Sequence, residues 1–211
     1  LKDIEVSKED QAVILTTTNS LANTINQDRL SHLPGKEITY EAVASGKFEE
    51  SAYPTDTSLK LKKGAQVILI KNDPGKLWVN GTLAKVVALS NDSIVVDIDG
   101  RTCDVPVAKW QKIEYSYNKD EDKIEDEVVG AFAQYPIKLA WAITIHKSQG
   151  QTFDKVIIDL GYGAFTHGQL YVALSRCTRL DGIRLKRAVV QSDIIFDRRI
   201  YEFKDRFANL F

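Results

Sequence analysis

Two kinds of β pattern occupy different parts of this 211-residue chain. Short continuous apolar runs stand at residues 11–18 (QAVILTTT), 139–146 (LAWAITIH), 155–160 (KVIIDL) and 182–190 (GIRLKRAVV). Such runs are typical of strands that are covered on both faces, as in a parallel sheet. Stretches with helical spacing alternate with them, which predicts an α/β domain with a parallel sheet and helices on both faces.

Three segments have the spacing of helices. The first follows the first apolar run, where Asn19 or Ser20 can cap it and Pro34-Gly35 stops it. The second covers residues 167–177 and places four side chains on one face: Leu170, Ala173, Leu174 and Cys177. The third lies near the C-terminus and has an apolar face made of Ile200, Phe203 and Phe207.

The pattern changes after Lys60. Short alternating runs follow, separated by turn sequences such as Asn72-Asp73-Pro74-Gly75 and Asp99-Gly100. Short, evenly spaced strands with this turn chemistry indicate a small antiparallel barrel. Because the buried-strand pattern resumes afterwards, we interpret residues 59–115 as a barrel module inserted into an α/β domain made of residues 1–58 and 116–211.

Composition excludes several classes of protein. A chain with 44% apolar and 27% charged residues is not disordered or collagenous. It contains no run of the roughly 18 apolar residues that a membrane span needs. Its first residues do not resemble a signal peptide, so we expect none. Cys103 and Cys177 match no metal-ligand spacing, so we expect reduced thiols, no structural metal and an intracellular location, cytoplasmic in a bacterium or nuclear or mitochondrial in a eukaryote. The chain has no Met and opens with Leu1, so we expect it to be a piece of a longer polypeptide.

Charge is balanced overall but uneven along the chain. The formal net charge is -1, whereas residues 119–127 hold two lysines against six carboxylates. Residues 176–199 hold seven basic side chains against three aspartates. A charge run is usually a solvated surface, but a local basic face can bind phosphate even when the whole domain is neutral.

The first motif with chemical potential is residues 144–152 (TIHKSQGQT), where a buried strand ends. In open α/β sheets, ligands bind beyond the carboxyl ends of the strands. Polar side chains with exposed backbone N–H groups suit phosphate oxygens, and Gly150 permits a close approach. The alternative is a surface loop in which His146 and Lys147 are merely solvated.

The second motif is residues 169–179 (QLYVALSRCTR). Its apolar positions fix a helix against the sheet, so Arg176 leaves from a rigid element. A planar, permanently charged guanidinium held in that way suits a phosphoryl group that gains charge during transfer. The alternative is an arginine that closes a structural salt bridge.

These two motifs, in this order, resemble motifs V and VI of superfamily 1 helicases, particularly the 5′-to-3′ branch that includes the PIF-type and RecD-type DNA helicases. Residues 15–26 (LTTTNSLANTIN) resemble motif IV of that family, and residues 64–73 with 78–86 resemble its inserted Src-homology-3-like barrel. The resemblance covers essentially the entire chain. It implies a RecA-like second motor domain interrupted by the small barrel.

One part of the family pattern is absent from the sequence. Each of the Gly-Lys pairs at Gly35, Gly46 and Gly75 lacks the Ser or Thr of a phosphate loop. Asp126-Glu127 imitates a Mg²⁺-binding acidic box, but no apolar strand precedes it, so we interpret it as a decoy. The resemblance therefore implies that ATP and Mg²⁺ are bound mainly by a first motor domain, which is the expected partner of this chain.

The resemblance also implies roles for single residues. Arg176 would be the arginine finger, and Gly150 and Gln151 would lie near the γ-phosphate of ATP. The barrel would help to close a channel over the DNA strand. The residues expected to contact single-stranded DNA, including that at duplex junctions, are Thr18, Asn19, Asn80, Thr144, His146, Lys147 and Ser148.

These roles predict the behaviour of the isolated chain. An arginine finger acts only on a nucleotide that a phosphate loop and Mg²⁺ already hold, so we expect the chain alone to have no ATPase activity. Its DNA binding should be weak, salt-sensitive and independent of sequence. Two other hypotheses stay open at this point: a free-standing nucleic-acid-binding module, and a domain of an inactive helicase paralogue.

Overall fold

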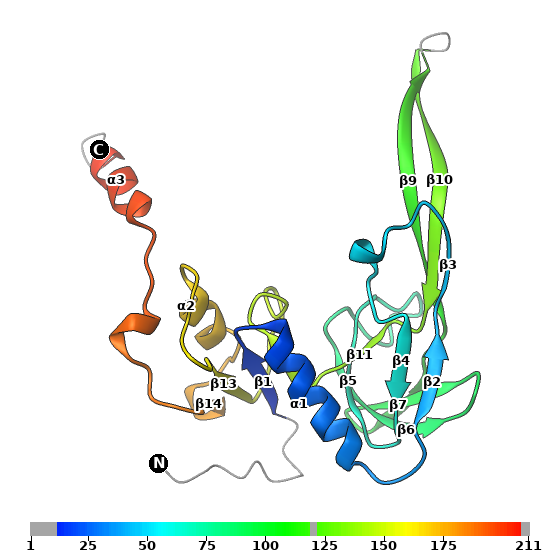
Figure 1. Cartoon of the computed structure of the whole chain (residues 1–211), viewed down its shortest axis with the longest axis horizontal. Coiled ribbons are helices and arrows are strands. Elements are labelled where there is room, and N and C mark those ends of the chain that lie inside the picture. Colours follow the sequence, from blue (N-terminus) through cyan, green and yellow to red (C-terminus); the bar gives the residue numbers. More distant parts are fainter. Residues whose placement is uncertain (1–11, 119–121, 208–211) are drawn as a thin grey trace. The chain divides into compact units, whose positions relative to one another are not determined.

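The computed structural model describes residues 12–118 and 122–207 (Figure 1). The chain divides into two compact units. One contains Leu1–Arg29 and Trp141–Phe211, and the other contains Leu30–Ala140. The fold combines a parallel sheet in the first unit with antiparallel sheets in the second. No helix in the described part of the chain has the length and apolar character that crossing a membrane requires.

The first unit contains the parallel sheet that the apolar runs predict. Its strand order is β12-β1-β13-β14, and every neighbouring pair is parallel. The strands are β1 (Val13–Thr16), β12 (Ala142–Thr144), β13 (Val156–Asp159) and β14 (Ile183–Leu185). All four residues of β13 are buried, as expected for a central strand of a covered sheet.

Helix α1 (Asn19–His32) follows β1, but its cap differs from the prediction. The Thr18 hydroxyl accepts a hydrogen bond from the Leu21 N–H at 3.3 Å, so Thr18 and not Asn19 or Ser20 occupies the N-cap. The helix is fastened to the edge strand by a buried amide. Asn26 Nδ2 donates to the Ala142 carbonyl at 2.8 Å, and Asn26 Oδ1 accepts from the Ala142 N–H at 2.9 Å.

Helix α2 (Gln169–Leu174) is shorter than the predicted helix over residues 167–177. Gly168, with a φ of +68°, precedes it, and Cys177 lies beyond its end in an isolated parallel bridge with Phe153. Helix α3 (Arg198–Phe207) confirms the third predicted helix, with Ile200 and Phe203 exposed. The side chain of Phe207 lies outside the described ones. The described part of the chain also contains three short 3-10 turns: Glu50–Ala52, Leu180–Gly182 and Gln191–Asp193.

The predicted strand over residues 139–146 is split into two strands in different sheets. β11 (Ile137–Leu139) pairs with an antiparallel strand of the second unit, whereas β12 joins the parallel sheet. The switch takes place at two neighbouring residues. The Ala140 N–H donates to the Gln66 carbonyl, and the Trp141 carbonyl accepts from the Ile14 N–H. A continuous apolar run cannot reveal such a change of partner.

The second unit contains a five-stranded antiparallel sheet in the order β11-β5-β6-β7-β8. Its further strands are β5 (Gln66–Leu69), β6 (Leu83–Leu89), β7 (Ile94–Ile98) and β8 (Arg101–Asp104). Strands β7 and β8 form a hairpin across Asp99-Gly100, as the turn sequence predicts. The alternating runs of the sequence thus correspond to real antiparallel strands.

The second unit extends beyond the predicted limits of 59 and 115. Strands on both sides of the expected module belong to it: β2 (Ile38–Glu41), β3 (Val43–Gly46), β4 (Ser58–Leu61), β9 (Ala108–Asn118) and β10 (Lys123–Gln134). β2 pairs with β4, and β10 pairs with both β3 and β9. The β3–β10 pairing joins residues 43–46 to residues 130–133. This long-range pairing joins the segments on either side of the predicted module.

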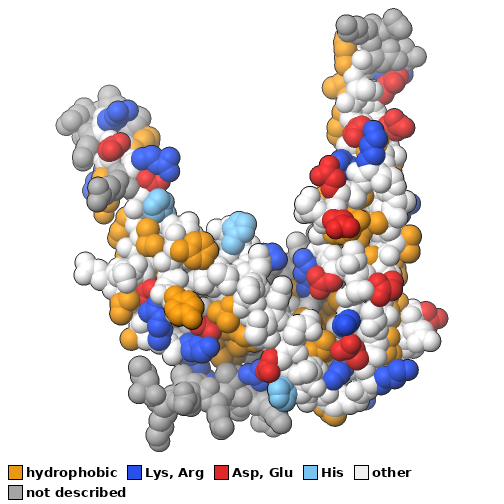
Figure 2. All heavy atoms as spheres, in the orientation of Figure 1, with side chains coloured by type: hydrophobic (Ala, Val, Ile, Leu, Met, Phe, Trp, Pro, Cys, Tyr) orange, Lys and Arg blue, Asp and Glu red, His pale blue; other side chains and the backbone are white. Residues whose placement is uncertain are grey.

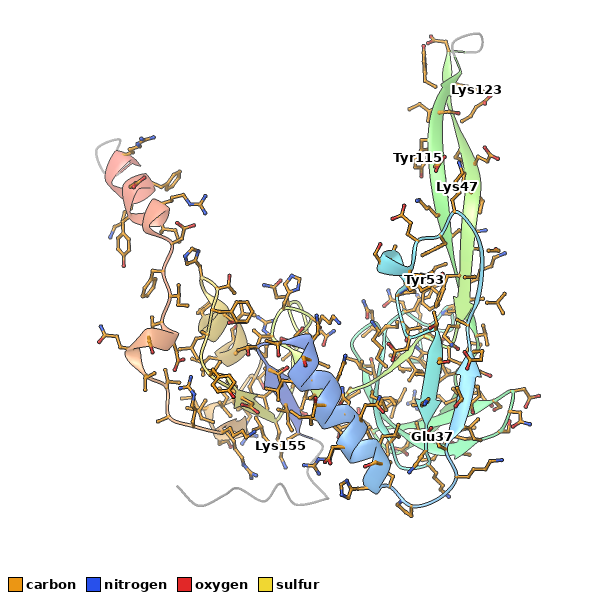
Figure 3. The ribbon with its side chains drawn as sticks, in the orientation of Figure 1. Glu37, Lys47, Tyr53, Tyr115, Lys123 and Lys155 are labelled. Atoms are coloured by element: carbon orange, nitrogen blue, oxygen red, sulfur yellow. The ribbon has the colours of Figure 1, made fainter. Side chains whose placement is uncertain are left out.

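The long β9–β10 hairpin contains most of the acidic run (Figure 3). Asp126 and Glu127 lie on β10, opposite Tyr115 and Glu114 of β9, and are exposed. They therefore do not follow a buried parallel strand, which agrees with the interpretation of this pair as a decoy. Residues 119–121 of the run lie outside the described residues.

Candidate functional site

Three loops meet at the carboxyl edge of the parallel sheet. They follow β12, β1 and β13, which are neighbours in the strand order. The Ile145 N–H donates to the Thr16 carbonyl at 2.8 Å, which joins the first loop to the second. A Cβ added to Gly161 would lie 3.9 Å from Thr17 Oγ1, which places the third loop beside the second. This is the edge at which parallel α/β sheets bind ligands.

The Arg176 guanidinium is held by oxygen atoms of two elements. Its Nε donates to the Val172 carbonyl at 3.0 Å, and its Nη2 donates to the Ser175 hydroxyl at 2.8 Å. Its Nη1 reaches the loop after β12 and donates to the Gln151 carbonyl at 3.0 Å and the Ser148 carbonyl at 3.4 Å. The side chain is half-buried and bound at all three nitrogens. These bonds hold the guanidinium in a fixed position, as expected from the sequence.

The backbone holds the two motifs together as well. The Phe153 N–H donates to the Arg176 carbonyl at 2.9 Å, and Phe153 forms a parallel bridge with Cys177. The loop that contains Gly150 is therefore attached both to the Arg176 side chain and to its main chain. The structure brings together the two stretches that the sequence singled out.

Arg176 differs from other cations of the basic stretch in its electrostatics. Among the residues that the structure describes, no carboxylate pairs with Arg176. Four neighbouring cations do form ion pairs: Arg179 with Asp181, Lys186 with Asp159, Arg187 with Asp193 and Arg199 with Asp197. The basic stretch is thus largely neutralised, and the salt-bridge alternative for Arg176 finds no partner in the described part of the chain. Its positive charge is available to an anionic ligand.

Gly150 has open space beside its backbone, and Gln151 has a buried polar atom. Gly150 has a φ of +78°, and no heavy atom lies within 4 Å of the position that a Cβ would occupy. The side-chain Oε1 of Gln151 is buried and has no hydrogen-bond partner among the described residues. Buried polar atoms without partners are rare in folded proteins and mark sites that bind or move. Both residues therefore fit a ligand-contacting loop.

Two of the hydroxyls predicted to contact DNA, those of Thr144 and Ser148, are buried. Ser148 is 0% exposed, and its hydroxyl donates to the Ile145 carbonyl at 2.7 Å. The buried Thr144 hydroxyl accepts from the Lys147 N–H at 3.3 Å. Both hydroxyls satisfy backbone groups of the loop and fix its turn. Both side chains shape the loop, and neither is exposed on the surface of the loop.

The other residues predicted to contact DNA are exposed. His146 and Lys147 project from the loop after β12, and Thr18 and Asn19 stand at the start of α1. Thr18 also serves as the helix cap. Asn80 lies in the antiparallel unit, where its N–H donates to Asn72 Oδ1 at 2.7 Å.

Sequence reasoning missed the residues that support this edge. Asp159 ends β13 and accepts from the Gly161 N–H at 3.0 Å. Gln169 Oε1 accepts from the Phe165 N–H at 3.0 Å, and Asp193 is buried in its pair with Arg187. A carboxylate directly after an apolar run was a usable signal for Asp159. Asp193 had none, because sequence alone counts it as one charge of a mixed stretch.

The described residues contain no cluster of metal-binding side chains. No group of three or more His, Cys, Asp or Glu side chains in the described part of the chain could hold a metal ion. Cys103 and Cys177 are free thiols. The site offers a guanidinium and loop backbone to an anion.

Comparison with known proteins agrees with the motifs. Residues 139–180, which contain both motifs, match the UvrD-like helicase C-terminal domain. Over 194 residues the chain is 36% identical to the ATP-dependent DNA helicase Pif1 of Bdellovibrio bacteriovorus, covering 90% of this chain and 42% of that protein. The chain is homologous to Pif1-type helicases.

Solved Pif1 structures match the fold. The unliganded Pif1 of a Bacteroides species superimposes with a TM-score of 0.86 at 38% identity, covering 96% of this chain and 47% of that one. Bacteroides Pif1 in complex with ADP-AlF3 and single-stranded DNA gives a TM-score of 0.79 at 37% identity. This match covers 99% of this chain and 48% of that one. This chain therefore spans less than half the length of these Pif1 relatives.

Proposed function

We propose that this chain forms the second motor half of an ATP-dependent 5′-to-3′ DNA helicase and supplies its arginine finger. One observation carries the proposal: the Arg176 guanidinium is fixed on the carbonyls of Ser148 and Gln151 and has no carboxylate partner among the described residues. Arg179 and Arg187, by contrast, are paired with Asp181 and Asp193. A guanidinium that is held rigidly but keeps its charge suits a phosphoryl group.

The nucleotide is the first ligand of the proposed site. When bound, ATP with Mg²⁺ supplies the phosphoryl group and the countercharge, and both would be held mainly by a first motor domain. This chain would contribute Arg176, which stabilises charge on the phosphate, together with the Gly150–Gln151 backbone beside it. The Bacteroides Pif1 relative is in complex with ADP-AlF3, which supports a nucleotide site in this family.

Single-stranded DNA is the second ligand. We assign its phosphates to the exposed side chains Thr18, Asn19, His146 and Lys147, while Thr144 and Ser148 hold the loop in shape. All six lie at the carboxyl edge of the parallel sheet or directly beyond it. The same Bacteroides structure contains single-stranded DNA. We extend the proposal to duplex junctions, because a helicase acts where a single strand meets a duplex.

The antiparallel unit is the third element. We propose that its five-stranded sheet corresponds to the Src-homology-3-like barrel inserted into the motor domain, and that Asn80 helps to close a channel over the strand. The strand order β11-β5-β6-β7-β8 and the short hairpin at Asp99-Gly100 support this assignment.

ATPase assays test the proposal directly. The full-length protein should hydrolyse ATP in the presence of single-stranded DNA, whereas this chain alone should not, because it contains no phosphate loop. A full-length protein that binds DNA without ATPase activity would favour an inactive paralogue. Turnover by the isolated chain would contradict the proposed division of labour.

A further inference from the structure

The loop between β13 and α2 displays two aromatic side chains that have no role in the proposed function so far. It spans residues 160–168 (LGYGAFTHG). Tyr162 is fully exposed and Phe165 is 64% exposed. Figure 2 shows hydrophobic side chains on the molecular surface around α2. Two exposed rings on one short loop require an explanation, because aromatic side chains gain the most from burial.

The backbone of this loop is nevertheless well fastened. Five of its N–H groups donate hydrogen bonds within the first unit. The acceptors are Asp159 Oδ1 for Gly161, the Leu160 carbonyl for Gly163, Asp193 Oδ1 for Ala164, Gln169 Oε1 for Phe165 and the Ile195 carbonyl for Gly168. The main chain is thus held on both sides of Tyr162 and at Phe165 itself. The rings are displayed from a fixed loop.

An ion pair between the buried Asp193 and the half-buried Arg187 anchors the loop. Asp193 is 1% exposed, and its carboxylate accepts from Arg187 Nη2 at 2.6 Å and from Nη1 at 2.8 Å. Arg187 Nε also donates to the Gly161 carbonyl at 3.3 Å. Gly163 lies next to this pair, since a Cβ there would be 3.5 Å from Asp193 Oδ1. Its φ of +143° is a backbone conformation that favours glycine.

The loop lies at the edge that we assign to DNA. Gly161 is next to Thr17, and Thr18 and Asn19 follow directly in the chain. The loop itself contains no lysine or arginine, so it offers little to a phosphate. Its rings suit the other part of a single strand, the flat faces of unpaired bases, which stack on aromatic side chains regardless of sequence.

We propose that Tyr162 and Phe165 form a stacking platform for bases of the single strand whose phosphates contact the neighbouring loops. The inference rests on the proposed function and adds the base-contacting residues to it. Rings on a fixed loop lose little conformational freedom when a base stacks on them. Binding at this platform is independent of base identity but requires that bases be present.

Binding to base-bearing and abasic oligonucleotides tests the platform. In the full-length protein, Tyr162→Ala and Phe165→Ala should each weaken binding of fluorescent oligo(dT) about tenfold, as expected for the loss of one stacked base. A matched oligonucleotide with a central abasic stretch should bind these variants and the unmodified protein equally. Tyr162→Phe keeps the ring and should retain oligo(dT) binding. Leu180→Ala, which removes an exposed side chain elsewhere in the same unit, is the control and should change neither affinity.

The outcomes separate this inference from the proposed function. Equal losses on both oligonucleotides would overturn the platform, since they indicate a structural role or a contact of the rings with another part of the protein. Unchanged oligo(dT) binding in both alanine variants would overturn it as well, while leaving the helicase proposal intact. If the unmodified protein fails to bind oligo(dT) at all, the proposed function itself fails. Thermal midpoints of the variants should match that of the unmodified protein, because the Tyr162 side chain is fully exposed.

Discussion

Arg176 Nη1 donates a hydrogen bond to the backbone carbonyl of Gln151 at 3.0 Å. This contact links the residue proposed to touch the phosphate with the loop proposed to respond to it. Any movement of the guanidinium toward a phosphate must change this bond or carry the loop along. The two motifs therefore act as one unit, although 16 residues lie between them in the chain.

Lys147 should contribute to DNA binding through its charge. We expect Lys147→Ala in the full-length protein to weaken binding of single-stranded DNA and to reduce the slope of log affinity against log salt by about 0.7, since one phosphate contact is lost. Binding titrations at several salt concentrations measure this slope. Lys155→Ala is the control, because Lys155 directly precedes β13 and so lies at the amino edge of the parallel sheet, whereas Lys147 lies at the carboxyl edge. This control should not change the slope. An unaltered slope in Lys147→Ala would remove this residue from the DNA track.

Gly150 should matter through its backbone conformation. Its φ of +78° disfavours any side chain by roughly 1 kcal/mol, although the space around it is open. We expect Gly150→Ala to shift the loop and lower DNA-stimulated ATPase activity roughly 10- to 100-fold.

Gly35 provides a matched control for this variant. It also has a positive φ, +93°, with no heavy atom within 4 Å of a Cβ, but it follows α1 and belongs to the second unit. Gly35→Ala carries the same backbone strain and should leave turnover unchanged. Equal turnover in the two variants would show that the Gly150 loop takes no part in hydrolysis.

The Asp193–Arg187 pair should make stability depend on pH. Hydrogen bonds from Arg187 and from the Val190 N–H hold the pKa of Asp193 well below its usual range. The unfolded chain therefore takes up a proton at a higher pH than the folded chain, so the pair stabilises the fold above about pH 4 and loses this effect as the pH falls further.

Thermal unfolding of Asp193→Asn measures this effect. At pH 7 the variant should melt at a lower temperature than the unmodified protein, and the difference should shrink as the pH falls below about 4. Asp181→Asn is the control, because its pair with Arg179 is exposed and should contribute little to stability. A constant difference at all pH values would show that the Asp193 charge is not responsible.

The parallel sheet and the meeting of the two motifs could be predicted from the sequence. Both follow from local features: continuous apolar runs give covered strands, and the carboxyl ends of such strands share one edge. The position of Arg176 depends on the helix that it follows, and the apolar residues of that helix are visible in the sequence. Its contact partners, which are carbonyl oxygens, are not visible, because every residue has one.

The limits of the antiparallel unit and the loop after β13 could not be predicted. The pairing of β3 with β10 joins segments more than 80 residues apart, and no local pattern encodes it. Thr144 and Ser148 look like ligand-binding hydroxyls until their burial is known. Asp193 is one carboxylate among many in the sequence, and only the fold places it beneath Gly163.

The ATPase activity of the Arg176→Ala variant of the full-length protein tests the central claim most directly. We expect DNA-stimulated turnover to fall by about 10³-fold or more, with ATP binding largely retained, because the guanidinium acts on the phosphoryl group during transfer. Arg179→Ala removes a nearby arginine that is already paired with Asp181 and should leave turnover close to normal. Near-normal turnover in Arg176→Ala would contradict the account.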